Sequence, residues 1–199
     1  MTDNTLLTNP PLILASSSPR RRELLDQIQV SYKTLPVNID ESLIPGEPAE
    51  QLVKRLATEK AEAGYEKNPH CIVLGSDTIV IIGSTILGKP VNKAQGIEML
   101  TLLSGNTHYV MTAVAVHSSH YKACVTSVSE VEFVELTTQQ IEAYWETGEP
   151  EDKAGAYGVQ GIAAQFIKKI NGSYSGIMGL PLFETAQLLE KSGIKTLAR

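Results

Sequence analysis

An apolar run, a serine-rich turn and three consecutive arginines near the N-terminus constrain this chain more than any other stretch. Residues 12–15 are apolar and predict a short buried strand. Ser18 is a good N-cap and Pro19 suits the first helical position, so the sequence predicts a helix from Pro19 to about residue 29. We therefore expect a strand-to-helix turn at the three serines.

The arginines after this turn are unexpected on electrostatic grounds, because the N-terminus of a helix carries a partial positive charge that disfavours cations. A bound polyanion would reverse the sign of that cost. Free backbone N–H groups, serine hydroxyls and guanidinium groups at one turn together suit a phosphate group. The stretch therefore predicts a phosphate site. The alternative is a solvated basic helix face beside an ordinary turn.

An aspartate inside an apolar run is the best catalytic candidate on physical grounds. Residues 71–74 and 79–82 are almost entirely apolar and indicate buried strand, and Asp77 lies between them. A buried carboxylate is costly unless it is paired or binds a metal. The alternative is an aspartate that caps a local turn. A hairpin at residues 83–90 brings Lys89 back towards Asp77.

A long helix is predicted from Pro48 to about Tyr65, with apolar residues spaced three and four apart. Lys60 follows Leu56 by four positions and Val53 by seven, so it points along the apolar stripe. A lysine at such a position either extends to solvent at the edge of the stripe or reaches into a site.

Strands and helices alternate along the rest of the chain. We expect strands at 30–35, 107–116, 125–134 and 165–170, and helices over 92–104, after Thr137, and up to about residue 192. Residues 153–161 are rich in glycine, which permits close backbone approach to a ligand or a strand, and Gln160 there can read a base edge. This pattern predicts an α/β fold with a mixed central sheet and flanking helices, with two lobes around a cleft as one arrangement. We expect residues 1–11 to form a flexible tail and 12–199 a single domain.

The overall charge limits the choice of partner. The 199 residues carry 17 basic and 22 acidic side chains, a net charge of −5, which disfavours a long nucleic acid but not a small phosphorylated ligand. Cys71 and Cys124 form no disulfide framework, and no basic, apolar leader opens the chain, so a cytoplasmic protein is expected. No apolar run is long enough to suggest a membrane span. His117 and His120 have no third ligand nearby in sequence, so they are weak metal candidates.

The sequence resembles the Maf-like nucleoside triphosphate pyrophosphatases over nearly its whole length, from residue 12 to about residue 189. Several motifs in the same order carry the resemblance, and together they are far more specific than any one alone. They are Ser16, Ser18, Pro19, Arg20 and Arg21; Ala57, Glu59, Lys60 and Ala61; Gly75, Ser76, Asp77 and Thr78; Lys89 and Pro90; residues 154–161; and residues 179–182.

The resemblance implies an ITPase-like fold and hydrolysis of a nucleoside triphosphate to the monophosphate and pyrophosphate, with a divalent cation (Mg²⁺ or Mn²⁺). It implies catalytic roles for Asp77, Lys60 and Lys89. Glu41, in an acidic loop, is the expected metal ligand. A homodimer is compatible with this assignment. The substrate-binding residues implied are Ser16, Arg20, Arg21, Thr78 and Gln160, while Arg22 is expected on the solvated side of the helix.

Within that family the chain is similar to the branch that acts on dTTP and UTP, in which Arg20, Thr78 and Gln160 are the specificity positions. Gly88 departs from that branch and is similar to the branch that acts on 7-methyl-GTP. Two other functions stay open at this point. A nucleotidyltransferase would need an acceptor molecule, and a non-catalytic regulator of cell division would bind a nucleotide or nucleic acid without releasing pyrophosphate.

Overall fold

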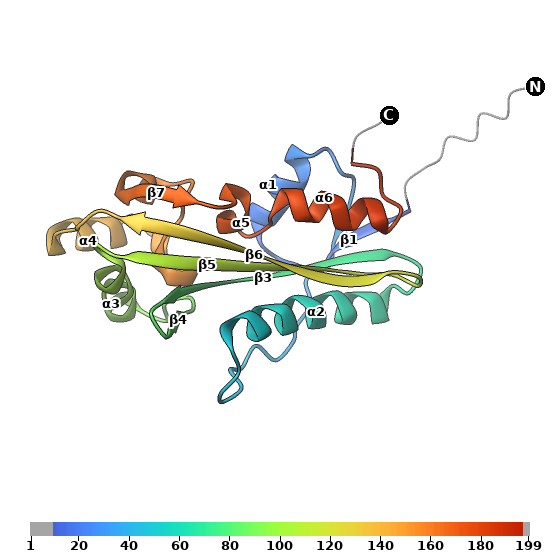
Figure 1. Cartoon of the computed structure of the whole chain (residues 1–199), viewed down its shortest axis with the longest axis horizontal. Helices are drawn as coiled ribbons and strands as arrows, with labels where there is room; N and C mark the ends of the chain where they lie inside the picture. The colour runs from blue at the N-terminus through green and yellow to red at the C-terminus, as the bar shows by residue number, and fades with distance from the viewer. Residues whose placement is uncertain (1–9, 197–199) are drawn as a thin grey trace, which may run out of the picture.

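A mixed β-sheet of seven strands forms the centre of the computed structural model, which describes residues 10–196 (Figure 1). The predicted tail lies almost entirely outside the described residues. The strand order is β2-β1-β3-β5-β6-β7, with β4 paired to β3. The β1–β2 and β1–β3 pairs are parallel and the others antiparallel. The strands are β1 Leu12–Leu14, β2 Lys33–Thr34, β3 Ile72–Ile82, β4 Thr85–Leu87, β5 Thr107–His117, β6 Lys122–Phe133 and β7 Ile167–Asn171.

Helices cover both faces of this sheet, which confirms the predicted α/β class. In Figure 1, α2 lies on one side of the sheet and α1 and α6 on the other, while α3 and α4 lie at the opposite end. The described residues contain no helix long and apolar enough to cross a membrane. The α-helices are α1 Pro19–Gln27, α2 Ala49–Lys67, α3 Lys93–Leu103, α4 Thr138–Trp145, α5 Tyr174–Met178 and α6 Leu182–Lys191, and the 3-10 helices are η1 Glu149–Asp152, η2 Ala154–Ala156 and η3 Ile162–Phe166.

Three elements differ from the sequence-based expectation. The strand expected at 30–35 shrinks to the two exposed residues of β2. The strand expected at 165–170 begins at Ile167, because η3 occupies the five residues before it. The short helix α5 was not predicted. Its N-cap is Ser173, whose hydroxyl accepts the backbone N–H of Gly176 at 3.0 Å.

The core forms separate packed groups at the two ends of the long strands. Side chains alternate between the two faces of β3. Thus Ile79 packs with α2, whereas Val80 packs with α3 and α4. At the other end of the strand, Leu74 packs with α1 and α6. The middle of β3 therefore lies where these groups meet.

One edge of β3 is interrupted. Its residues 72–74 pair with β1 and its residues 80–82 pair with β4, while β5 pairs with residues 73–81 along the opposite edge. Within residues 10–196, the stretch 75–79 is thus paired on one side alone. The chain leaves β1 for the serine turn where this gap begins, so the open edge faces that turn.

Gly75 allows α2 to approach the open stretch closely. A Cβ atom at this position would lie 2.3 Å from the carbonyl oxygen of Ala57 and 2.6 Å from the backbone nitrogen of Ala61. Both atoms belong to the backbone of α2 and cannot move aside as a side-chain tip could. The glycine therefore sets the distance between β3 and the turn of α2 that carries Lys60.

We predict that Gly75→Ala lowers the free energy of unfolding by roughly 1–3 kcal/mol, because the new methyl group overlaps helix backbone. Urea denaturation monitored by circular dichroism measures the change. Gly88→Ala is the matched control, since no heavy atom lies within 4 Å of the Cβ it would add. Equal stability of the two variants would contradict the proposed contact.

Candidate active site

A cleft of about 560 Å³ opens over the unpaired stretch of β3. The serine turn, α2, the end of β4 and the glycine-rich segment all contribute to its walls. Five cationic side chains and three carboxylates line it, although the whole chain carries a net charge of −5. The cleft therefore concentrates positive charge on an acidic protein, as a small anionic ligand requires. These charged residues are Arg20, Arg21, Lys60, Lys89, Lys153, Glu41, Asp77 and Asp152.

Asp77 stands on the floor of the cleft and is paired with Lys60. The Lys60 Nζ lies 2.7 Å from Asp77 Oδ1 and 2.7 Å from Glu41 Oε1. The side chains of Lys60 and Asp77 are 12% and 11% exposed, so the pair is largely withdrawn from water. In the described part of the chain, Asp77 Oδ2 has no hydrogen-bond partner and stays available to a ligand or a water molecule.

Glu41 lies at the mouth of the cleft, where its side chain is 60% exposed. Partial burial favours a higher pKa for this carboxyl group. The hydrogen bond from Lys60, together with the charges of Lys60, Lys89 and Arg21, outweighs it and holds the pKa of Glu41 below its ordinary value. Glu41 is therefore a carboxylate at neutral pH.

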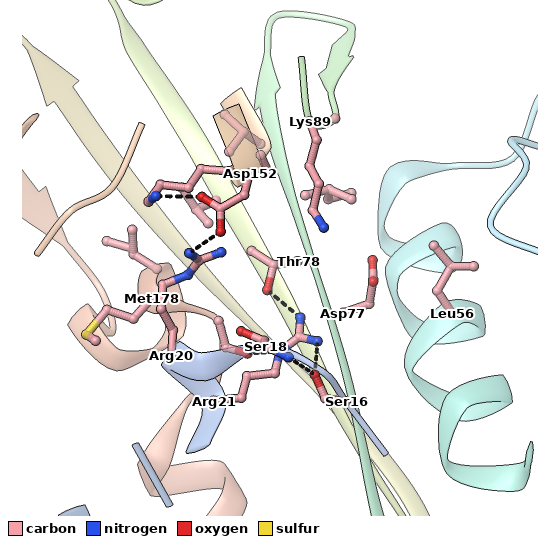
Figure 2. A pocket seen from close by; sticks show the side chains of 18 of the residues that line it. Ser16, Ser18, Arg20, Arg21, Leu56, Asp77, Thr78, Lys89, Asp152 and Met178 are labelled. Carbon is pink, nitrogen blue, oxygen red and sulfur yellow. Dashed lines mark hydrogen bonds and ion pairs between the residues drawn. The ribbon is translucent and has the colours of Figure 1, made fainter. Parts of the chain in front are cut away.

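Arg21 is a partly buried cation that contacts neutral oxygens. Its Nε donates to the Gly179 carbonyl at 2.9 Å, one terminal nitrogen to Ser16 Oγ at 3.3 Å and the other to Thr78 Oγ1 at 3.4 Å (Figure 2). Burial lowers the pKa of Arg21, against the opposing attraction of Asp77. A guanidinium has five N–H groups, so two remain for a ligand.

The electrostatic state of Arg21 implies an anionic ligand. Charges that are partly withdrawn from water are usually paired, yet among the described residues no carboxylate lies within ion-pair distance of this guanidinium. An anion in the cleft would supply the missing charge. Of the three arginines, Arg21 thus fits the predicted phosphate site best, and the site itself stays a prediction.

Ser16 presents a hydrogen-bond donor at the same place. Its hydroxyl oxygen accepts the backbone N–H of Ser18 at 3.1 Å and the Arg21 guanidinium at 3.3 Å. Both lone pairs are thereby used, which leaves the hydroxyl hydrogen free to donate to a ligand. Ser18 is the N-cap of α1, and its side chain makes no capping bond.

The Thr78 hydroxyl differs from that of Ser16 in what it can offer a ligand, because it presents an acceptor and not a donor. The hydroxyl of Thr112 donates to the Gly176 carbonyl at 2.7 Å, so it must accept at its 2.9 Å contact with the Thr78 hydroxyl. The Thr78 hydroxyl therefore donates its hydrogen to Thr112 and accepts a hydrogen bond from Arg21. One lone pair remains, and Thr78 can offer a ligand an acceptor but not a donor.

Arg20 reaches the other wall of the cleft. It donates to Asp152 Oδ2 at 3.0 Å, and Asp152 Oδ1 accepts from Lys153 at 2.6 Å. This contact joins α1 to η1, which is 132 residues later in the chain. Arg22 is exposed, as expected.

Lys89 and Gln160 lie at the rim. Both are exposed and line the cleft. In Figure 2 the Lys89 amine reaches inward from the segment after β4, towards the space above Asp77 and Thr78. The structure thus gathers every predicted site residue around one cleft, and it leaves their individual roles as predictions.

Sequence reasoning missed Asp152, Lys153 and Thr112. Asp152 lies in an acidic run directly before the glycine-rich segment, and that position was a usable signal. Residues 111–113 are similar to the dTTP/UTP branch, but the contact that Thr112 makes depends on the register of β5 against β3, where it lies opposite Thr78.

Two carboxylates of the cleft are suited to help hold a divalent cation. The described residues contain no group of three or more His, Cys, Asp or Glu side chains able to hold a metal ion by themselves. Glu41 and Asp77 share one lysine, so their carboxylates converge. Mg²⁺ is commonly held by one or two carboxylates together with water and substrate phosphates, and these two residues fit that pattern.

The contribution of the Lys60–Asp77 ion pair to the free energy of unfolding can be measured. We predict that the double-mutant cycle of Lys60→Met and Asp77→Asn shows a coupling of about 1–3 kcal/mol in the free energy of unfolding. Lys60→Met leaves the largely buried Asp77 carboxylate without its cation, and Asp77→Asn removes the more buried of the two carboxylates that Lys60 contacts. Urea denaturation of the four proteins measures it.

The matched control is the Lys54–Glu50 pair on the same helix, whose side chains are 43% and 56% exposed. Lys54→Met and Glu50→Gln should couple by less than about 0.5 kcal/mol. Equal coupling in the two cycles would show that the cleft pair gains nothing from its burial.

Comparison with known proteins identifies the family to which this chain belongs. A family model described as Maf-like protein matches residues 11–192. A dTTP/UTP pyrophosphatase of Pseudoalteromonas atlantica is 49% identical over 92% of this chain and 97% of its own. One of Aromatoleum aromaticum is 51% identical over 92% and 95%. The solved Staphylococcus aureus Ham1 protein is 14% identical, with a TM-score of 0.47 over 78% of this chain and 90% of its own, which is too remote to bear on the site. The motifs, the match across nearly the whole chain and these relatives show that the chain belongs to the Maf family.

Proposed function

We propose that this protein is a nucleoside triphosphate pyrophosphatase, a hydrolase of acid anhydrides that converts dTTP and UTP to the monophosphate and pyrophosphate. The observation that carries the proposal is the partly buried guanidinium of Arg21, which has no carboxylate partner among the described residues and lines the same cleft as the Asp77–Lys60 pair. The relatives named above, at about half identity over nearly the full length, support these substrates.

The residues of the cleft suit attack of water on the α-phosphorus. Asp77 Oδ2 is free to take a proton from water, while Lys60 holds Asp77 Oδ1 in place. As the water oxygen bonds to phosphorus, the bond from phosphorus to the bridging oxygen breaks. The electron pair leaves with pyrophosphate.

Cationic and hydroxyl groups stabilise the charge that develops on the phosphate oxygens. Two N–H groups of Arg21 and the hydroxyl of Ser16 are available as donors on one side of Asp77. Lys89 approaches from the rim on the other side. A divalent cation, when bound, would neutralise part of the triphosphate charge, and Glu41 and Asp77 are the residues that would hold it.

Base selection follows from the polarity of Thr78. Uracil and thymine carry a hydrogen at N3, whereas cytosine carries a lone pair there. An acceptor at Thr78 pairs with the first and leaves the second unsatisfied, and a buried mismatch of this kind discriminates strongly. The Gln160 amide, which can both donate and accept, and Arg20 would complete recognition of the base.

The same proposal places the protein in the cytoplasm, where its substrates are made. The two cysteines are both free thiols, which agrees with a reducing compartment.

We predict that the protein, supplied with Mg²⁺ or Mn²⁺, releases pyrophosphate and monophosphate from dTTP and UTP without any acceptor molecule. Asp77→Asn should lower kcat by about 10²–10⁴, because the general base is lost. A panel of dTTP, UTP, CTP and 7-methyl-GTP, with both products quantified, measures activity and choice of base.

Asp26→Asn on the exposed face of α1 is the control and should keep wild-type turnover. Near wild-type turnover by Asp77→Asn would refute the assignment of the base. Preference for 7-methyl-GTP would place the protein in the other branch, and a requirement for an acceptor would indicate a transferase. Tight, steeply salt-dependent binding of duplex DNA without pyrophosphate release would favour a regulator.

We predict that Thr78→Val lowers the preference for UTP over CTP by about tenfold, because valine has the same shape but no acceptor. The ratio of kcat/KM for the two nucleotides measures the change. Thr126→Val is the control, since its buried hydroxyl has no hydrogen-bond partner in the described chain and it does not line the cleft. An unchanged ratio in Thr78→Val would rule out the hydroxyl as the element that reads the base.

A further inference from the structure

A glutamate outside the cleft wall organises the segment that carries Gln160. Glu149 opens η1, directly after the left-handed Gly148. Its Oε2 accepts the backbone N–H of Ile162 at 2.8 Å, and its Oε1 accepts that of Ala163 at 3.3 Å. The carboxylate thus holds the chain two and three residues after Gln160.

The same carboxylate also acts on the other side of Gln160, through Tyr144. The Tyr144 hydroxyl donates to Glu149 Oε1 at 2.8 Å and accepts the backbone N–H of Gly158 at 3.2 Å. Burial raises the pKa of Tyr144, and the bond to Glu149 raises it further, so the hydroxyl stays a donor at neutral pH. One Glu–Tyr pair therefore fixes the backbone both before and after Gln160.

One glycine of this segment, Gly161, is explained by its contact with Glu149. A Cβ atom at Gly161 would lie 2.2 Å from Glu149 Oε2. The close approach that Gly161 allows is thus an approach to a carboxylate of the same chain. The segment 158–163 wraps around this carboxylate, and Gln160 stands exposed on its outer side, at the cleft.

The 3-10 helix that begins at Glu149 also reaches Arg20. Asp152, at the end of η1, accepts from Arg20, and Lys153 donates both to Asp152 and to the Glu149 carbonyl at 2.6 Å. Two of the groups proposed to read the base, Arg20 and Gln160, are therefore anchored to one short element. The groups beside the reacting phosphate, Asp77 and Lys60, are anchored elsewhere, on β3 and α2.

We propose that Glu149 is a positioning residue for the nucleobase: it clamps residues 158–163 so that Gln160 faces the cleft, and it takes no part in phosphate chemistry. The inference rests on the proposed function for its substrate, and on the hydrogen bonds of Glu149 for its structure. Loss of the clamp should weaken recognition of the base and leave the chemical step intact.

The test is Glu149→Gln. An amide in place of the carboxylate presents an NH₂ group to at least one backbone N–H, so the segment is released. We expect KM for dTTP and UTP to rise about tenfold and their preference over CTP to fall, while kcat stays within about threefold. Glu151→Gln on the same η1 is the matched control, because the exposed Glu151 carboxylate makes no hydrogen bond or ion pair within residues 10–196.

Amide hydrogen exchange of the protein without nucleotide tests the clamp directly. Exchange at Gly158, Ile162 and Ala163 should accelerate in Glu149→Gln and not in Glu151→Gln. Tyr144→Phe keeps the buried ring and removes the hydroxyl, so it should reproduce the effect at Gly158 even if Glu149→Gln folds poorly.

Each outcome decides one question. Unchanged exchange overturns the clamp, whether or not the wild-type protein hydrolyses a nucleotide. Accelerated exchange with kcat and KM altered alike for every nucleotide overturns the role in base recognition and leaves a purely structural one. Absence of pyrophosphate release by the wild-type protein overturns the proposed function, and with it the role in base recognition, but not the clamp.

Discussion

The interrupted edge of β3 is the constraint on which the rest of the site depends. A strand paired on both edges would present side chains above and below the sheet, with no opening between them. Here the pairing with β1 stops at Leu74 and that with β4 starts at Val80. Asp77 and Thr78 point to opposite faces of the sheet, yet both line the same cleft, because the edge between them is open. A single gap in the pairing thus joins the Asp77 carboxylate on one face to the Thr78 hydroxyl, proposed to read the base, on the other.

Charge in the cleft is arranged unevenly. On the α2 side, Lys60 is shared between two carboxylates, so that part of the site is neutralised from within. On the α1 side, Arg21 is partly buried against neutral oxygens and makes no direct ion pair among the described residues. The unmatched cation provides affinity for an anion, and the matched group provides a held carboxylate. A site in which both cations were paired with carboxylates would attract phosphate only weakly.

Much of the candidate site can be predicted from the sequence alone, since the burial and charge of a residue depend largely on its neighbours in the chain. Asp77 was marked by its apolar neighbours and Lys60 by its place on a helical stripe, and the structure brings the two together. The missed features depend on distant partners. Thr112 acquires its role from strand register, and Glu149 from a fold of the chain that returns residues 162–163 to it. The strand predicted at 165–170 was displaced because η3 precedes it, and apolar periodicity does not separate a short 3-10 turn from a strand.

Gly75 has a consequence for how the site can change over time. The distance between Asp77 and Lys60 is set by contact of backbone with backbone, at a residue that has no side chain to vary. Substitutions elsewhere on α2 or β3 can alter the polarity of the cleft but not this spacing. The rim, carried by loops and by η1, has no such restriction. Proteins with this arrangement should therefore diverge mainly in the base that they accept. The separation of Asp77 and Lys60 should stay the same among them.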